Sequence, residues 1–193
     1  MQNEEKIILD LCGGTGSWSK FYKLAGYDVR VITLPDYDVR TYIPPRNVYG
    51  ILAAPPCTHF ASSGAQYWPA KDRDGRTISD TQILTHCLRI IAMSAPKFWA
   101  LENPVGRMTK WLGRPQFIFN PCDYGDRYTK RTCLWGKFRP MWKTIVQPEF
   151  LIASNGDRYS KIHMKTGGKS AKTKERRSIT PAGFAKAFYL ANQ

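Results

Sequence analysis

The sequence predicts an α/β sandwich with a largely parallel sheet. Over the first hundred residues, short apolar runs typical of buried strands alternate with segments of helical spacing, and the first run ends in a glycine-rich turn. The chain has 193 residues, of which 42% are hydrophobic, and this is enough to bury one core without disulfides. We therefore expect a single domain over residues 1–193.

The first half of the chain contains three predicted strands. Apolar runs place them at residues 6–11, 29–34 and 49–54. A tight turn over residues 12–16 follows the first, and Ser17 caps a helix that we expect to end near residue 25, before Gly26. Pro55 stops the third strand because proline cannot donate to a sheet ladder.

The second half begins with a long predicted helix at residues 81–94. Its apolar residues recur at helical spacing, Ser79 or Asp80 is the expected N-cap, and Pro96 ends it. Further strands are predicted at residues 97–101, 117–119 and 132–135. Thr180 and Pro181 open a last helix, predicted for residues 180–192.

A basic segment precedes that last helix. Residues 157–177 hold eight Lys or Arg against two acidic residues, contain two adjacent glycines and show no apolar period. We expect residues 152–177 to form a mobile basic loop. A second mobile stretch is expected at residues 58–77, which contain Gly64, Gly75 and a charged run.

Composition limits the possible partners. The formal net charge of +14 favours a polyanion, with nucleic acid as the first candidate. Five irregularly spaced cysteines argue against a disulfide framework, and without Cys-x-x-Cys or His-Glu-x-x-His we expect no metal. No apolar stretch approaches the roughly 20 residues of a membrane span, and the amino terminus is polar. We expect a cytoplasmic protein with no membrane partner.

The glycine-rich turn is a candidate cofactor site. The stretch Gly14-Thr15-Gly16-Ser17-Trp18-Ser19 approximates the fingerprint with which α/β folds bind nucleotides, with Ser19 in place of the third glycine. Asp36 and Asp38 follow at about the distance of a ribose-binding acid. The alternative is a plain tight turn without a ligand.

Cys57 and Glu102 each follow a predicted strand. Both are expected at the carboxyl edge of the sheet, where open α/β sheets bind ligands. A thiol beside a carboxyl group is the pairing that a covalent attack on an electron-poor ring requires. The alternatives are a buried turn cysteine and a solvated glutamate.

These motifs resemble those of the DNA cytosine-C5 methyltransferase family. Residues 9–16 resemble its S-adenosylmethionine motif, Ala54-Pro55-Pro56-Cys57 its nucleophile motif, and Leu101-Glu102-Asn103-Pro104 its Glu-Asn-Val motif. Asp38-Val39 and residues 177–180 resemble two further motifs. The resemblance implies a Rossmann-like methyltransferase sandwich, with an antiparallel strand near the end of the sheet. It also implies cofactor contacts from Asp10, Cys12, Gly13, Gly14, Gly16, Ser17, Trp18, Asp36, Asp38 and Pro55.

The resemblance further implies a mechanism. Cys57 would add to C6 of a cytosine flipped out of duplex DNA, while Glu102 hydrogen-bonds the protonated N3 and C5 takes the methyl group. The basic residue near the cytosine carbonyl would be Lys130, which matches best, or instead Arg131. Contacts to DNA are expected from Ser62, Gly64, Lys161, Lys165, Lys169, Lys172, Lys174, Arg176 and Arg177.

The chain also departs from the family pattern. The family's tenth motif is not visible, Thr58-His59 replaces Gln-Gly, and a short basic segment stands where relatives have a large target-recognition domain. We therefore expect a monomeric enzyme of short or relaxed sequence preference, encoded by a phage or mobile element. The alternatives are a methyltransferase acting on RNA or on a free cytosine nucleotide, and a catalytically inert nucleic-acid-binding protein. Zinc-dependent deamination is excluded because no His-x-Glu is present.

Overall fold

The computed structural model describes residues 2–160 and 171–193, with side chains described from residue 175 in the second range. Six strands form one sheet in the order β2-β1-β3-β4-β6-β5, and two more form a hairpin. The strands are β1 Ile7–Leu11, β2 Asp28–Ile32, β3 Val48–Ala53, β4 Phe98–Pro104, β5 Phe117–Phe119, β6 Thr132–Lys137, β7 Phe150–Ile152 and β8 Arg158–Ser160.

The sheet is mostly parallel. β1 pairs in parallel with β2 on one side and with β3 on the other, and β3 pairs in parallel with β4. β6 runs antiparallel to both β4 and β5. This topology confirms the predicted Rossmann-like α/β fold with an antiparallel strand near the end of the sheet. The strand order reverses between β1 and β3, and such a point is where open α/β sheets bind ligands.

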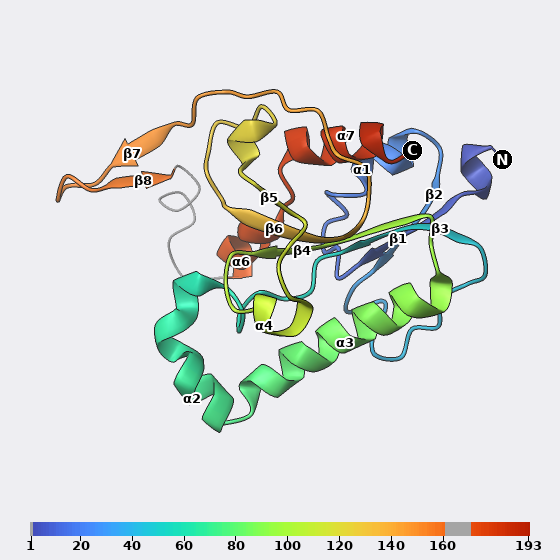
Figure 1. Ribbon diagram of the computed structural model, residues 1–193, viewed down its shortest axis with the longest axis horizontal. Coiled ribbons are helices and arrows are strands. Elements are labelled where there is room, and N and C mark those ends of the chain that lie inside the picture. Colours follow the sequence, from blue (N-terminus) through green and yellow to red (C-terminus); the bar gives the residue numbers. More distant parts are fainter. Residues whose placement is uncertain (1, 161–170) are drawn as a thin grey trace.

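Helices cover both faces of the sheet (Figure 1), with α3 and α4 on one side and α1 and α7 on the other. The α-helices are α1 Lys20–Leu24, α2 Trp68–Arg73, α3 Arg76–Ser94, α4 Thr109–Leu112, α6 Ala171–Ser178 and α7 Ala182–Ala191. The described residues also form three short 3-10 helices, η1 Asn3–Glu5, η2 Ser62–Tyr67 and η3 Pro121–Asp123.

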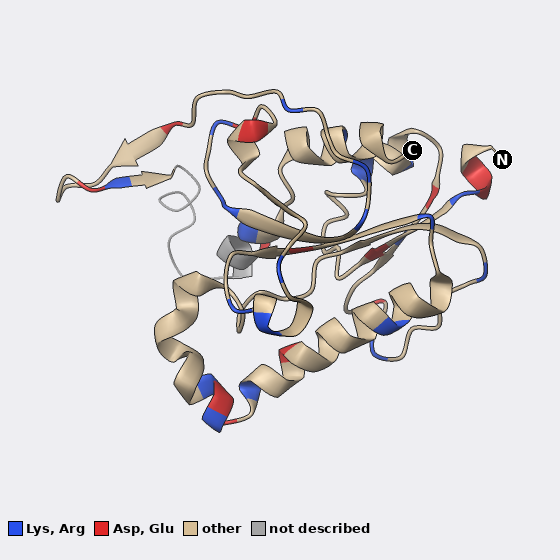
Figure 2. Cartoon of the chain, in the orientation of Figure 1, with Lys and Arg blue, Asp and Glu red and all other residues tan. Residues whose placement is uncertain are grey.

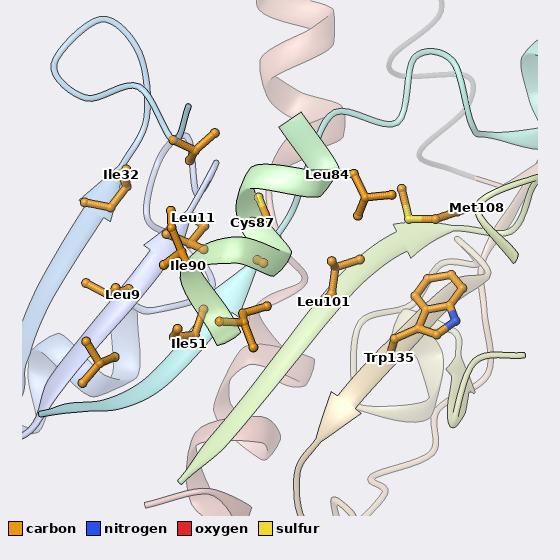
Figure 3. Close-up of a cluster of buried hydrophobic side chains, with 14 of the residues drawn as sticks. Leu9, Leu11, Ile32, Ile51, Leu84, Cys87, Ile90, Leu101, Met108 and Trp135 are labelled. Carbon is orange, nitrogen blue, oxygen red and sulfur yellow. The ribbon is translucent and has the colours of Figure 1, made fainter. Parts of the chain in front are cut away.

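Two buried clusters hold the layers together. On one face, the apolar side of α3 packs against β1, β3 and β4, as the side chains Leu84, Cys87, Ile90, Leu9, Leu11, Ile51 and Leu101 show in Figure 3. The opposite face is aromatic: the rings of Phe119 and Phe184 stack at 3.9 Å between centroids, and Phe188 packs on Phe98. The two clusters thus hold the helix layers on the sheet.

The helix α3 begins earlier than the sequence predicts. It starts at Arg76, directly after Gly75, whose φ of +76° turns the chain, so Ser79 and Asp80 lie inside the helix and neither is its N-cap. Asp80 is instead buried. The first helix is shorter than expected, because α1 begins at Lys20 with Ser19 at the N-cap position, and Ser17 lies outside it.

Two segments predicted as loops contain secondary structure. Residues 58–77 form η2 and α2, and Figure 2 shows basic and acidic residues alternating where α2 meets α3. Within residues 152–177, β8 pairs with β7 in a hairpin and α6 begins at Ala171. These described parts therefore contain helices and strands where the sequence predicts loops, while their mobility stays a prediction; residues 161–170 lie outside the described residues.

Candidate active site

The carboxyl ends of β1, β3 and β4 form the edge that carries the site. The parallel register sets Leu11 opposite Ala53, and Ala53 opposite Leu101, so the turns after β1 and β3 are neighbours of the end of β4. The backbone N–H of Ala54 donates to the carbonyl of Leu11 at 2.9 Å. The side-chain amide of Asn103 donates to the carbonyl of Pro55 at 2.9 Å. The three strand ends are thus joined by hydrogen bonds.

Cys57 lies in a closed turn at this edge. Its carbonyl accepts hydrogen bonds from the N–H groups of Phe60 at 3.0 Å and Ala61 at 2.9 Å, and Phe60 is fully buried. Burial raises the pKa of the Cys57 thiol, the Glu102 carboxylate raises it further, and Lys130 opposes both effects. The thiol therefore lies within the electrostatic field of both predicted partners.

Glu102 lies near the end of β4, opposite Leu134 of β6, and is only partly exposed. Burial raises the pKa of its carboxyl group, because the charged form loses hydration, while Lys130 lowers it. A carboxyl group with a raised pKa keeps its proton to higher pH and can donate a hydrogen bond to a ring nitrogen.

Lys130, rather than Arg131, approaches the two residues. Lys130 influences the pKa of both Cys57 and Glu102, and its Nζ donates to the carbonyl of Arg177 at 3.0 Å. Arg131 is exposed and acts instead on Cys133 of β6. Lys130 is thus the one of the two that acts by its charge on both Cys57 and Glu102, and its role near a bound base stays a prediction.

The turn after β1 has the backbone shape of a ligand-binding loop. Cys12, Gly14 and Gly16 all have positive φ, at 57°, 53° and 67°. A Cβ atom added to Gly14 would meet only the Oγ of Ser178, at 4.0 Å, so the outer side of this glycine is open. Gly13, in contrast, has no room for a side chain, because a Cβ atom there would lie 2.4 Å from the carboxyl carbon of Asp10.

Asp10 supports this turn from inside the protein. It is fully buried, its Oδ2 accepts from the Ser19 hydroxyl at 2.6 Å, and its Oδ1 has no partner among the described residues. Burial raises the pKa of Asp10 to about 6. Ser17 ties the turn to the C-terminal segment, because its Oγ accepts from the N–H of Thr180 at 2.9 Å.

Of three other predicted cofactor residues, one is buried, one is ion-paired and one is exposed. Trp18 is only 2% exposed and packs edge-on against Phe188, so its side chain belongs to the aromatic core, and its predicted cofactor contact stays a prediction. Asp38 is paired with Arg40, which holds the pKa of that carboxyl at about 2, whereas Asp36 is exposed.

The predicted DNA contacts are only partly described. Ser62 and Gly64 lie in η2, where the N–H of Ser62 donates to the carbonyl of Val105 at 2.9 Å. Arg176 and Arg177 are exposed on α6. Lys172 and Lys174 belong to α6, but their side chains are not described, and Lys161, Lys165 and Lys169 lie outside the described residues.

Arg107 is a site-supporting residue that the sequence did not single out. It is 5% exposed, and its guanidinium donates to the carbonyl of His59 at 2.7 Å, to Asp72 at 2.7 Å and to the Thr77 hydroxyl at 2.8 Å. Lys71 donates to the carbonyl of Thr58 at 2.7 Å. These contacts join residues far apart in sequence, so no local pattern could have revealed them.

A groove of about 550 Å³ lies beside α3 and α4, lined by Thr81, Thr85, His86, Lys110 and Trp111 among others. Neither Cys57 nor Glu102 lines it, so we do not assign it to the candidate site. Across residues 2–160 and 171–193, no three His, Cys, Asp or Glu side chains gather as a metal site would require. In the same ranges, no helix combines the length and apolar character of a membrane span.

A likeness to known proteins is found in structure. No protein-family model matches the chain, and no curated protein matches it. A solved structure with a similar fold is that of a candidate DNA modification methyltransferase encoded within an E. coli prophage, at 16% identity and a TM-score of 0.49. The match covers 74% of this chain and 52% of that protein. We infer neither the site nor its chemistry from this likeness.

Proposed function

We propose that the chain is an S-adenosylmethionine-dependent methyltransferase that methylates C5 of cytosine in DNA through a covalent adduct at Cys57. The observation that carries this proposal is the parallel register of β1, β3 and β4, which brings the glycine turn, Cys57 and Glu102 to one sheet edge. The influence of Glu102 and Lys130 on the thiol supports the same grouping.

The chemistry requires each of these groups. Cytosine C5 is a poor nucleophile, so the Cys57 thiolate forms a bond to C6 while Glu102 gives its proton to N3. The electron pair then resides at C5, which takes the methyl group. Loss of the C5 proton to solvent, cleavage of the bond from sulfur to C6 and return of the N3 proton to Glu102 restore the enzyme. Burial raises the pKa of Glu102, and this favours the protonated form that the first step requires.

The residues of the β1 turn fit the cofactor. S-adenosylmethionine, when bound, supplies an electrophilic methyl group on a sulfonium. Positive φ at Cys12, Gly14 and Gly16, with the open outer side of Gly14, lets a ligand approach the backbone closely. The hydrogen bond from Ala54 to Leu11 keeps this turn next to that of Cys57.

DNA is the proposed substrate because of charge. The net charge of +14 attracts phosphates, and Arg176 and Arg177 are exposed on α6, whose C-terminal end is bonded to Lys130. A cytosine in a duplex hides its C6 face, so the base must be flipped out to reach Cys57.

A methyl-transfer assay tests the proposal. The purified chain is incubated with methyl-labelled S-adenosylmethionine and either duplex DNA, single-stranded DNA, tRNA or dCMP, and the products are digested and identified by mass spectrometry. We expect labelled 5-methyldeoxycytidine from duplex DNA. The label is lost in Cys57→Ser and kept in Cys122→Ser, a partly exposed cysteine away from the site. Label in tRNA alone, or on an exocyclic nitrogen, would contradict the proposal.

We further propose a short or relaxed sequence preference. Contacts to phosphate carry no sequence information, and the sequence has only a short basic segment, residues 152–177, where the resembling family has a large target-recognition domain. Bisulfite sequencing of plasmid DNA from cells that express the chain tests this. Methylation spread over many contexts is expected, whereas confinement to one motif of four or more bases would exclude it.

A further inference from the structure

His59 and Asp80 form a pair beside the Cys57 turn. The Nδ1 of His59 lies 2.5 Å from the Oδ2 of Asp80, and the two side chains are only 13% and 10% exposed. His59 is two residues beyond Cys57, whereas Asp80 comes from α3, which packs on the sheet from another layer. The pair therefore connects the candidate nucleophile turn to the helix layer.

The same turn is held from two other directions. Arg107 donates to the carbonyl of His59 at 2.7 Å, and Lys71 of α2 donates to the carbonyl of Thr58 at 2.7 Å. Both carbonyls belong to the residues that directly follow Cys57. Only the contact with Asp80 uses the side chain of His59, whereas Arg107 and Lys71 bond to backbone carbonyls. A substitution at His59 can therefore remove the Asp80 contact and leave the hydrogen bonds from Arg107 and Lys71 in place.

Asp80 also acts on the thiol by its charge. The groups that influence Cys57 are Glu102 of β4, Asp80 of α3 and Lys130 before β6, and both acids raise the pKa of the thiol. A hydrogen-bonded partner on the Asp80 carboxylate withdraws negative charge from that oxygen and reduces its effect on neighbours. His59 is the described partner of this oxygen. The charged groups around His59 are Asp80, Asp74 at the turn before α3, and the two cations on the turn's carbonyls, Arg107 and Lys71.

We propose that His59 and Asp80 are positioning residues for the candidate nucleophile: the pair clamps the Cys57 turn to α3, and His59 screens the thiol from the Asp80 carboxylate. The proposal rests on the proposed role of Cys57 as the nucleophile. The proposal gives a role to the side chain of His59, for which the sequence motifs provide no explanation.

Screening predicts opposite effects for two substitutions. Asp80→Asn removes a negative charge near the thiol, so Cys57 ionises at lower pH. His59→Leu removes the hydrogen-bonded partner of the Asp80 carboxylate, so this carboxylate acts more strongly on the thiol and Cys57 ionises at higher pH. Each shift is expected to be on the order of half a pH unit. A purely structural clamp would move both variants in the same direction, because either change loosens the turn.

The test is the pH dependence of Cys57 alkylation by iodoacetamide, followed on the Cys57 peptide by mass spectrometry. Circular dichroism and thermal melting first establish that each variant is folded, and His59→Met replaces His59→Leu if the latter does not fold. His86→Asn is the matched control, because His86 also lies in the α3 region but is bonded to Arg89 and does not influence Cys57. The control is expected to follow the wild-type curve.

Opposite shifts for the two variants support the proposal, and shifts of the same sign, or none, overturn it. Alkylation needs neither DNA nor cofactor, so its outcome is independent of methyl transfer. Failure of the methylation assay with opposite alkylation shifts would overturn the proposed function and leave the screening role intact.

Discussion

The side-chain amide of Asn103 donates a 2.9 Å hydrogen bond to the carbonyl of Pro55 and so fastens the end of β4 to the turn that carries Cys57. Asn103 is fully buried, so this bond is made out of contact with water. The spacing between Glu102 and Cys57 depends on it, because the two residues adjoin Asn103 and the Pro55 turn in sequence.

Substitution of Asn103 is expected to affect both stability and turnover. Asn103→Ala leaves the carbonyl of Pro55 without this partner and costs about 1–3 kcal/mol of unfolding free energy. Because the turn is no longer fixed to β4, kcat for methyl transfer falls more than KM for DNA rises. Denaturant unfolding and steady-state kinetics measure these changes. Asn155→Ala, an exposed change in the turn between β7 and β8, is the control, and equal effects from both variants would contradict the assignment.

Gly13 is expected to tolerate no side chain. A Cβ there would lie 2.4 Å from the carboxyl carbon of buried Asp10, so Gly13→Ala must displace the pair of Asp10 and Ser19. We expect a loss of about 1–3 kcal/mol in stability and at least a tenfold weaker binding of S-adenosylmethionine by calorimetry. Gly64→Ala is the control, because its added Cβ meets neighbours only at 3.9 Å. Unchanged cofactor binding in a folded Gly13→Ala protein would argue against this turn as the cofactor site.

Lys130 and Arg131 are expected to differ in their effect on pH dependence. The Lys130 charge lowers the pKa of both Cys57 and Glu102. In Lys130→Met the thiol therefore loses its proton at higher pH, and the rising limb of kcat/KM against pH moves to higher pH. Arg131→Met leaves that limb in place, because Arg131 is exposed and acts on Cys133. The reverse result would assign the basic role to Arg131.

Because of Asp10, the free energy of unfolding is expected to depend on pH in the mildly acidic range. Its pKa is about 6 in the folded protein against an ordinary value of 3.8, so the folded state binds more protons between these values. Stability therefore falls as pH rises through this window, by about 3 kcal/mol in total. Asp10→Asn flattens the dependence. Ser19→Ala removes a hydrogen bond that lowers this pKa, so the window extends to higher pH. Chemical unfolding at closely spaced pH values measures both effects.

Much of the site edge could be predicted from sequence because it follows from strand periodicity. Apolar runs that end before Cys57 and at Glu102 place both residues at the carboxyl ends of neighbouring strands, and the structure pairs those strands in parallel. The burial of the Trp18 side chain could not be predicted, because an aromatic residue beside a glycine turn fits a core as well as a ligand site. Its partners Phe184 and Phe188 lie over 160 residues away.

Contacts between segments far apart in the sequence could not be predicted from local sequence patterns. His59 and Asp80 are 21 residues apart, and the sequence assigns Asp80 to a helix cap. The helix α3 starts early, at Arg76, because Gly75 adopts a left-handed conformation. The spacing of apolar residues does not predict this conformation. The hairpin of β7 and β8 was missed because it is short and mostly exposed, so it lacks the apolar alternation of a buried strand.

Covalent trapping tests the role of Cys57 most directly. Duplex DNA with 5-fluorocytosine has no C5 proton to lose, so an adduct formed during methyl transfer cannot release the enzyme. We predict a complex of the chain with this DNA that survives denaturing electrophoresis, depends on S-adenosylmethionine, maps to the Cys57 peptide and is absent in Cys57→Ala. Methylation of ordinary DNA without any trapped complex, or a complex that persists in Cys57→Ala, would contradict the account.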